Sequence, residues 1–177
     1  EQMEADILKG KSLTDANFGV NFHMYQPNAK DIVELVIKHG VKAVSYSRSP
    51  GKEMVARLKD NGVVCMPTVG LPKHAIKAVE MGADAVTVQG GEGGGHTGAV
   101  PTTLLLPQVV DAVGDKVPVL GAGGFKDGRG LVAALAFGAD GIIGLGGGSS
   151  LDTAKVVALL ANIDQSIEEL FGVDLAR

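Results

Sequence analysis

The sequence predicts an α/β protein built on a parallel sheet, because one phrase recurs along it: a helix end, a glycine and a short apolar run. The phrase occurs at Gly40, Gly62, Gly82 and Gly138, where a helix C-terminus favours a residue in the left-handed conformation. The apolar runs after these glycines are continuous rather than alternating, which is typical of strands buried on both faces. Strands that alternate with helices in this way form a parallel sheet.

The individual elements follow from this phrase in chain order. Residues 2–11 are expected to form a helix ahead of the first strand. Residues 28–39 carry a broad apolar face of the kind that packs on a sheet. Pro72 and Asp127 are suited to the first turns of two later helices. The predicted strands cover residues 18–24, 43–48, 63–69, 85–89, 117–121 and 141–145. The predicted helices cover residues 28–39, 51–61, 72–81, 103–114, 127–137 and 150–161, with a short last helix at 164–171.

The number of βα units leaves two architectures open. A (β/α) barrel of the TIM type has eight units in about 250 residues, whereas this chain of 177 residues shows six. The sequence therefore predicts either a TIM-like barrel that lacks its first two units or an open doubly wound sheet. In both cases we expect residues 1–177 to form a single domain.

Composition excludes several classes of protein. The net charge of −4 gives no electrostatic basis for binding nucleic acid or an anionic membrane. No apolar run is long enough to span a bilayer, and the N-terminus has no signal-peptide pattern. The single cysteine, Cys65, is expected in a buried strand and fits a reducing compartment such as the cytoplasm. The histidines and this cysteine show no spacing typical of a metal site.

A glycine-rich segment after the fourth predicted strand is the strongest functional candidate. Residues 89–98 read Gln-Gly-Gly-Glu-Gly-Gly-Gly-His-Thr-Gly. Glycines at the C-terminal end of a strand let the backbone approach a phosphorylated ligand. His96 is a candidate acid or base, because the ordinary pKa of histidine lies near physiological pH. The alternative is a flexible surface loop with a solvated histidine.

Two further glycine-rich turns are candidate anion sites. The turn at Gly121–Gly124 exposes backbone N–H groups that suit a phosphate. The turn at residues 146–149 precedes a predicted helix whose N-terminus favours an anion. We expect Glu92 to shape its loop, whereas His23 and Thr68 are weaker candidates for facing the site from their strands.

Residues 89–98 resemble the Glu-x-Gly-Gly-His-x-Gly signature of the nitronate monooxygenase family. Residues 18–22, 81–90, 117–125 and 134–141 resemble further motifs of that family, in the family's order. The resemblance covers residues 1–143 and implies an FMN-binding barrel that oxidises alkyl nitronates with O2, with His96 as the base. It implies, together with the turn after the sixth strand, cofactor contacts at Asn21, Gln89, Gly94, Gly95, Gly121, Ala122, Gly123, Gly124, Gly144, Gly146, Gly147 and Ser149.

The C-terminal part resembles a second family. Residues 146–155 read Gly-Gly-Gly-Ser-Ser-Leu-Asp-Thr-Ala-Lys, which is similar to the nucleotide-binding motif of iron-containing alcohol dehydrogenases. We therefore interpret residues 1–143 as nitronate monooxygenase-like and residues 144–177 as a phosphate-binding turn followed by helices. The chain looks like a splice of two families near residues 141–145.

Three functions follow as hypotheses. The first is an FMN-dependent oxidoreductase acting on a nitronate or a related carbon acid with O2. The second is a hybrid scaffold that binds a phosphate or nucleotide without catalysis. The third is a reductase that uses a dinucleotide, either like the FMN- and NAD(P)H-dependent enoyl-acyl carrier protein reductases that share the Gly-Gly-His signature or like an alcohol dehydrogenase fragment. A homodimer would cover the open edge of an incomplete barrel.

Overall fold

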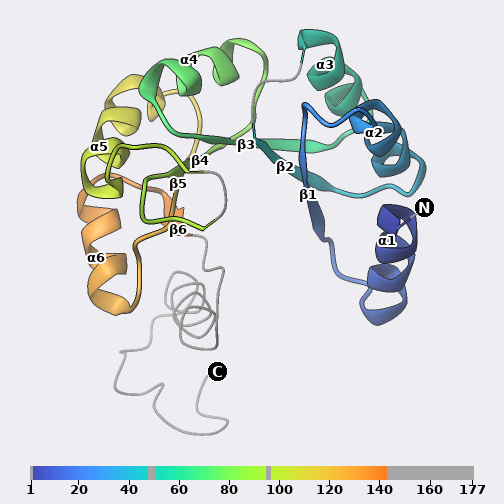
Figure 1. Ribbon diagram of the computed structural model, residues 1–177, viewed down its shortest axis with the longest axis horizontal. Helices are drawn as coiled ribbons and strands as arrows, with labels where there is room; N and C mark the ends of the chain where they lie inside the picture. Colours follow the sequence, from blue (N-terminus) through green and yellow to red (C-terminus); the bar gives the residue numbers. More distant parts are fainter. Residues whose placement is uncertain (1, 48–50, 95–96, 143–177) are drawn as a thin grey trace, which may run out of the picture.

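The computed structural model describes residues 2–47, 51–94 and 97–142 of the chain, in which parallel strands alternate with helices (Figure 1). The helices are α1 (Gln2–Leu13), α2 (Ala29–Lys38), α3 (Lys52–Asp60), α4 (Pro72–Glu80), α5 (Thr102–Val113) and α6 (Gly128–Ala136). The strands are β1 (Gly19–His23), β2 (Ala43–Ser47), β3 (Val64–Val69), β4 (Val86–Gln89), β5 (Val119–Ala122) and β6 (Gly141–Ile142).

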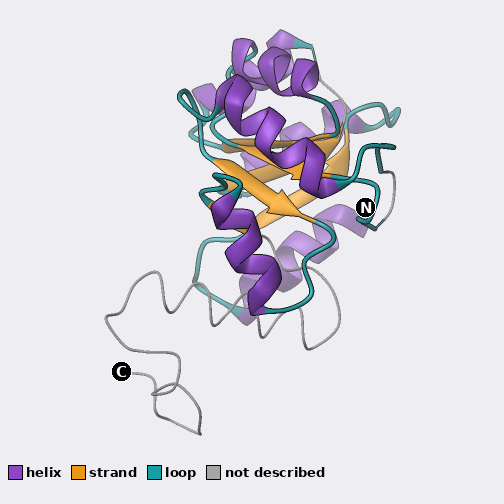
Figure 2. Cartoon of the chain, turned by 90° about the vertical axis from the view of Figure 1, so that its left-hand side faces the viewer, coloured by secondary structure: helices purple, strands orange, loops and turns teal. Residues whose placement is uncertain are grey.

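The order of the strands decides between the two predicted architectures. Each strand pairs in parallel with the next one in the chain, which gives the order β1-β2-β3-β4-β5-β6. A doubly wound sheet would reverse this order at a switch point. The helices instead form an arc around the outside of a curved sheet (Figure 1), so the view turned by 90° shows helices both in front of and behind the strands (Figure 2). The barrel-type winding is therefore confirmed, and the doubly wound alternative is wrong.

The core lies between the helices and the convex side of the sheet. One buried cluster joins α1, α2 and α3 to β1–β3, with Val36, Val44 and Leu58 fully buried. A second cluster joins α4, α5 and α6 to β3–β5, with Leu105 and Val119 fully buried. Burying a side chain of this size stabilises the fold by roughly 1.5–3 kcal/mol. The sheet is thus anchored on its helix side from β1 to β5.

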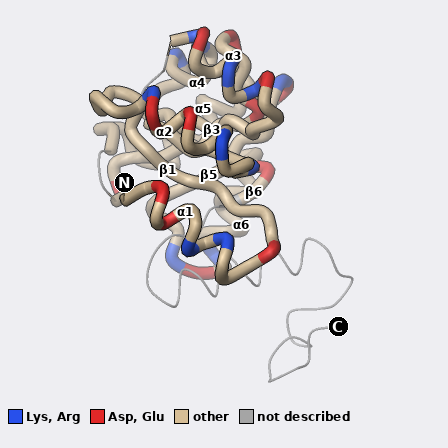
Figure 3. The backbone as a smooth tube through the Cα atoms, turned by 90° about the vertical axis from the view of Figure 1, so that its right-hand side faces the viewer, with Lys and Arg blue, Asp and Glu red and all other residues tan. Residues whose placement is uncertain are grey.

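In β2 and β3 the other side of the sheet is not buried to the same extent, which corrects the expectation of burial on both faces for these strands, whereas Val86, Thr87 and Val88 of β4 are all buried. Burial alternates along β2 and β3: Val44, Tyr46 and Cys65 are buried, whereas Ser45 and Ser47 are half-buried. Alternation arises because successive side chains point to opposite faces and helices cover only one of them. The strands β1–β5 contain no Lys, Arg, Asp or Glu, and the charged residues lie on helices and connections (Figure 3). The concave face is therefore polar but almost uncharged.

Two of the helix–glycine–strand connections share one arrangement, here called the aspartate joint. Gly82 and Gly138 end α4 and α6 with φ angles of 99° and 87°, which are left-handed as predicted. Two residues later, the Asp84 carboxylate accepts a hydrogen bond from the Cys65 N–H at 2.9 Å. The Asp140 carboxylate accepts one from the Val119 N–H at 2.8 Å. Each aspartate therefore ties the start of one strand to the start of its neighbour.

Most predicted elements agree with the structure to within two residues. The clearest difference is β5, which begins at Val119 rather than at residue 117, because the Val117 N–H still donates to the Val113 carbonyl at the end of α5. The predicted helices 150–161 and 164–171 lie outside the described residues. Among the helices that are described, none combines the length and apolar character needed to cross a bilayer.

Candidate functional site

The two glycine-rich segments that the sequence singled out separately lie against each other. The loop begins after Gln89 at the end of β4, the turn begins at the end of β5, and Gln89 pairs in register with Ala122. A Cβ atom added at Gly123 would lie 2.6 Å from Gly93 Cα and 2.9 Å from Gly93 N. The backbone of the loop therefore packs directly on the turn. Both lie at the C-terminal ends of the strands, where barrel enzymes place their active sites.

The turn after β5 has an unusual backbone. Gly123 and Gly124 adopt φ angles of 80° and 79°, in the left-handed region that favours glycine. Successive backbone N–H groups in such a turn form a concavity that attracts anions without a positive side chain. Helix α6 begins shortly afterwards, with the Asp127 carboxylate accepting from the Arg129 N–H at its first turn. The turn is thus suited to a phosphate, as predicted for Gly121–Gly124.

Polar side chains at both ends of the loop determine its shape. The Gln89 Nε2 group donates to the Gly94 carbonyl at 2.6 Å, so this side chain folds back onto the loop. The Glu92 carboxylate accepts from both the backbone N–H and the hydroxyl of Thr102, each at 2.9 Å. Thr102 is the first residue of α5, so Glu92 caps that helix from a distance. This agrees with the predicted role of Glu92 in shaping the loop, and the flavin contact at Gln89 stays a prediction.

The capping bonds predict a pH-dependent effect of Glu92. The bond from the Thr102 backbone N–H lowers the pKa of Glu92 below its ordinary value of 4.5. Since the folded state holds the ionised form, this stabilisation is present above pH 4.5 and is lost as the pH falls through the lowered pKa. We expect Glu92→Gln to lower the melting temperature at neutral pH by roughly 2–4 °C, the size of a lost helix cap.

Thermal unfolding at neutral and acidic pH checks this effect. The difference between Glu92→Gln and the parent chain should shrink in acid, where Glu92 itself is protonated. Glu80→Gln is the matched control, because Glu80 lies at the end of α4 rather than at the start of a helix. A Glu92→Gln variant as stable as the control at every pH would contradict the capping role.

The concave face carries polar side chains on adjacent strands. Asn21 lies in β1, two residues before the end of the strand, and its Nδ2 group donates to Ser45 Oγ at 3.2 Å. His23 Nδ1 and Ser47 Oγ form a hydrogen bond at the last residues of β1 and β2. Thr87 on β4 is 5% exposed, and its hydroxyl has no hydrogen-bond partner among the described residues. The sequence interpretation missed Ser47 and Thr87. Each is a polar residue next to apolar ones in its strand, and this pattern could have indicated a side chain on the face away from the helices.

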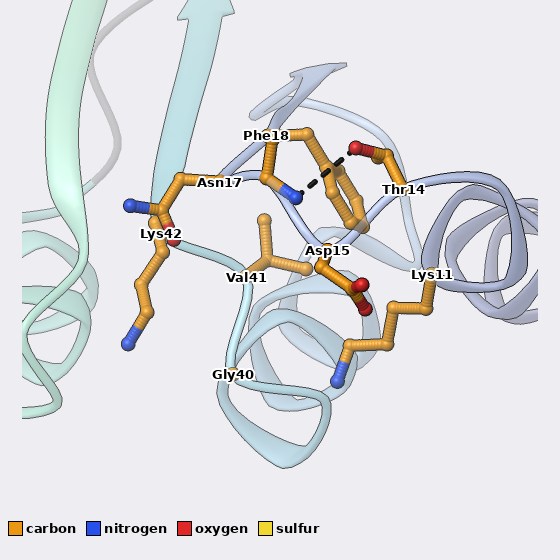
Figure 4. A pocket seen from close by; sticks show the side chains of 9 residues that line it. Lys11, Thr14, Asp15, Asn17, Phe18, Gly40, Val41 and Lys42 are labelled. Carbon is orange, nitrogen blue, oxygen red and sulfur yellow. Dashed lines mark hydrogen bonds between the residues drawn. The ribbon is translucent and has the colours of Figure 1, made fainter.

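A surface pocket of about 280 Å³ lies at the opposite end of the strands (Figure 4). Phe18, directly before β1, and Val41, two residues before β2, form part of its wall, together with Lys11 and Asp15 from the end of α1 and the loop after it. Barrels carry their chemistry at the C-terminal ends of the strands, and the opposite end serves stability. This pocket is therefore not the candidate active site.

The remaining predicted site residues lie outside the described residues: Gly95, His96, Gly144, Gly146, Gly147 and Ser149. The described part of the chain contains no group of three or more His, Cys, Asp and Glu residues arranged to hold a metal ion. Cys65 is buried as predicted, and burial raises the pKa of its thiol to about 11, so it is an inert core residue.

Comparisons with known proteins agree with this geometry. The chain is 53% identical over 143 residues to a Mycobacterium tuberculosis protein named (3aS,4S,5R,7aS)-5-hydroxy-7a-methyl-1-oxo-octahydro-1H-indene-4-carboxyl-CoA dehydrogenase, which covers 80% of this chain. It is 38% identical over 125 residues to a probable nitronate monooxygenase of Staphylococcus saprophyticus, covering 64% of this chain and 35% of that protein. The chain spans 40% of the length of the M. tuberculosis relative.

Solved structures give the same result. FabK from Thermotoga maritima aligns with a TM-score of 0.75 and 36% identity, over 79% of this chain and 44% of that one. A nitroalkane oxidase from Streptomyces ansochromogenes aligns with a TM-score of 0.71 and 28% identity, over 80% of this chain and 53% of that one. The iron-containing alcohol dehydrogenase family model matches residues 128–176. The nitronate monooxygenase family model matches residues 30–146, and the chain belongs to this family of oxidoreductases.

Proposed function

We propose that this chain carries the flavin and substrate site of an FMN-dependent oxidoreductase that acts on a carbon acid. The observation that supports it most is the packing of the loop after β4 on the turn after β5, shown by the 2.6 Å approach at Gly123. Gly93, which packs on this turn, precedes His96 by three residues in the sequence, and we assign the turn to the phosphate. Because the chain spans 40% of its M. tuberculosis relative, the proposal concerns the part of the site on β1–β6.

The described residues fit FMN on two counts. The Gly121–Gly124 turn offers backbone N–H groups to the phosphate, and apart from Ala122 its residues carry no side chain. The unpartnered hydroxyl of Thr87 is a buried polar group that lacks a hydrogen bond, and a polar ligand on the concave face would supply one. Bound FMN would accept two electrons from the substrate carbon and pass them to O2.

The protein's own residues would perform the proton chemistry. A neutral His96 takes a proton from the carbon next to an electron-withdrawing group, either a nitro group or a thioester carbonyl. The relatives support different substrates here: the 53% identical protein is named as a carboxyl-CoA dehydrogenase, and the 38% identical one as a probable nitronate monooxygenase. The proton step is the same for both. The Gly-Gly-His signature, which resembles that of FMN- and NAD(P)H-dependent enoyl-acyl carrier protein reductases, supports a second candidate, reduction of a substrate with NAD(P)H through the same flavin.

Retention of flavin tests the proposal directly. The purified chain is mixed with excess FMN or riboflavin and desalted, and its visible absorbance is recorded. We expect the flavin bands to remain with FMN and to be lost with riboflavin, which lacks the phosphate. Retention of neither flavin by a folded sample would overturn the proposal and favour a scaffold without catalysis, while equal retention of both would overturn the assignment of the phosphate to the turn.

Turnover of the FMN-loaded chain then separates the substrate classes. Oxidation of nitroethane or ethylnitronate with O2 supports nitronate chemistry, and flavin reduction by an acyl-CoA thioester supports the dehydrogenase chemistry. Oxidation of NADH by the loaded chain would favour the reductase candidate.

A further inference from the structure

The Glu92 side chain lies against the turn after β5, on the side where α5 begins. A Cβ atom added at Gly124 would lie 3.5 Å from Glu92 Cβ and 3.7 Å from the carboxyl carbon, Cδ. The hydroxyl oxygen of Thr102 would lie 3.6 Å from the same Cβ. A carboxylate is therefore in close contact with the glycine backbone that we assign to a phosphate.

Contacts on both sides of Glu92 hold this carboxylate in place. It accepts two hydrogen bonds from Thr102, which is 2% exposed at the start of α5. Before Glu92, Gly90 packs so closely on Thr102 that an added Cβ would lie 2.4 Å from the Thr102 N. After it, Gly93 packs on Gly123. The carboxylate therefore cannot turn away from the glycine turn without breaking these contacts.

Glu92 carries a charge that no cation neutralises in the described part of the chain. The hydrogen bond from the Thr102 backbone N–H lowers the pKa of Glu92, so the side chain is ionised at neutral pH. After the turn, Asp127 and Arg129 form an ion pair and offset each other. Lys126 is exposed and forms no ion pair with another described residue. Of the two unpaired charges beside the turn, Glu92 is the one that hydrogen bonds hold in place.

A fixed carboxylate beside an anion site distinguishes anions by their charge. The backbone N–H groups of the turn attract any phosphate, whereas the carboxylate repels each negative charge that the phosphate carries. A second charge about 6 Å from the carboxylate weakens binding by roughly 3-fold in bulk water, and by more at the lower effective dielectric constant of a protein surface. The repulsion therefore affects a doubly charged phosphate more than a singly charged one of the same shape.

We propose that Glu92 is a specificity-determining residue of the phosphate site, where its carboxylate favours a phosphate with one negative charge over a doubly charged one; this rests on the proposed function. The phosphate of FMN is a monoester and carries two charges above its second pKa of about 6. Each phosphate of a dinucleotide is esterified twice and carries one. The site therefore binds FMN less tightly than the turn alone would, and it holds a dinucleotide phosphate with less repulsion.

Two flavins that differ in charge rather than in shape test this inference. Riboflavin 5′-sulfate carries one negative charge, whereas FMN carries two at about pH 8, above its second phosphate pKa. Quenching of flavin fluorescence at this pH gives the dissociation constants of both flavins for the parent chain and for Glu92→Gln. Glutamine keeps an oxygen that accepts the Thr102 bonds, although more weakly, so the loop keeps its contacts while the charge is lost.

We expect Glu92→Gln to tighten the binding of FMN by roughly 3- to 10-fold relative to riboflavin 5′-sulfate. The gain should shrink at about 1 M salt, where charges further apart than about 3 Å are screened. Glu80→Gln is the matched control, because it removes the same charge at the end of α4, at the opposite end of the strands. An equal gain in Glu80→Gln would be an effect of net charge and would overturn the inference.

A second measurement uses the parent chain alone and does not depend on the folding of a variant. Repulsion by Glu92 raises the pKa of the bound phosphate, so FMN should take up protons on binding near neutral pH, relative to riboflavin 5′-sulfate. Calorimetric titrations in two buffers of different ionisation enthalpy measure this proton uptake. Proton release instead would show that the cations beside the turn outweigh Glu92, and no difference would show that its charge is not felt. Both results overturn the inference.

The outcomes separate this inference from the proposed function. If both flavins bind and Glu92→Gln leaves their relative affinity unchanged, the inference is overturned and the proposed function stands. If Glu92→Gln weakens both flavins equally, Glu92 only shapes the loop, and the inference is again overturned. If the folded parent chain binds neither flavin, the proposed function fails, and the inference that rests on it fails too. Melting temperatures show that each variant is folded.

Discussion

Replacing His96 with alanine is expected to lower kcat/KM for nitroethane by roughly 100- to 10,000-fold, the usual contribution of a general base. FMN retention should stay unchanged, since the phosphate is assigned to the turn after β5. The loss should be smaller for ethylnitronate, which has already lost the proton that the base removes. Steady-state oxygen consumption with both substrates measures the difference. His96 lies outside the described residues, so this expectation rests on the family motif and on the place of its loop.

The pH profile gives an independent readout of the same base. Because only the neutral imidazole accepts a proton, kcat/KM for nitroethane should fall in acid, where the imidazole is protonated. His74→Ala is the matched control, because His74 lies in the first turn of α4 and has no predicted role. Normal turnover of nitroethane by a flavin-loaded His96→Ala variant would remove His96 from the mechanism.

Replacing Gly123 with alanine is expected to destabilise the chain by about 2–5 kcal/mol and to abolish FMN retention. The left-handed φ of 80° is unfavourable for alanine, and the added Cβ would lie 2.6 Å from Gly93 Cα. To relieve that clash the loop after β4 must move away from the turn after β5. Urea denaturation monitored by circular dichroism measures the stability loss, and the desalting experiment measures the loss of FMN.

Two other glycines in the chain separate the causes. Gly40 has a φ of 62° but no atom within 4 Å of an added Cβ, so Gly40→Ala measures the conformational cost alone. Gly128 begins α6 with open space around it, and Gly128→Ala should be neutral or slightly stabilising. If Gly123→Ala cost no more than Gly40→Ala, the close packing of loop and turn would be refuted.

The sequence was sufficient for the order and type of the described elements because the evidence for them is local. A helix end, a left-handed glycine and an apolar strand lie within a few residues of one another, and the φ angles at Gly82 and Gly138 confirm this interpretation. Burial of both faces was predicted correctly for β4 but wrongly for β2, where Ser45 and Ser47 alternate with buried neighbours. The choice between barrel and doubly wound sheet needed the strand order, which depends on long-range pairing.

The candidate site was predictable only in part for the same reason. The two glycine-rich segments could be found separately, but their contact joins Gly93 to Gly123, far apart in the chain. Glu92 was expected to shape the loop, yet its partner Thr102 could not be identified from spacing alone. The alignment of His23, Ser47, Thr68 and Thr87 across β1–β4 depends on the register of four strands, which no single stretch of sequence specifies.

The aspartate joint has a consequence for how such proteins can be recombined. The nitronate monooxygenase and alcohol dehydrogenase family matches overlap over residues 128–146, which include α6, Gly138 and Asp140. Asp140 makes its bonds to Val119, on the strand before it, so the joint is complete before any downstream residue is needed. Segments of different ancestry can therefore be exchanged after such a joint without disturbing the units already formed. The equivalent joint at Asp84 offers a second crossover point for building new barrels from existing ones.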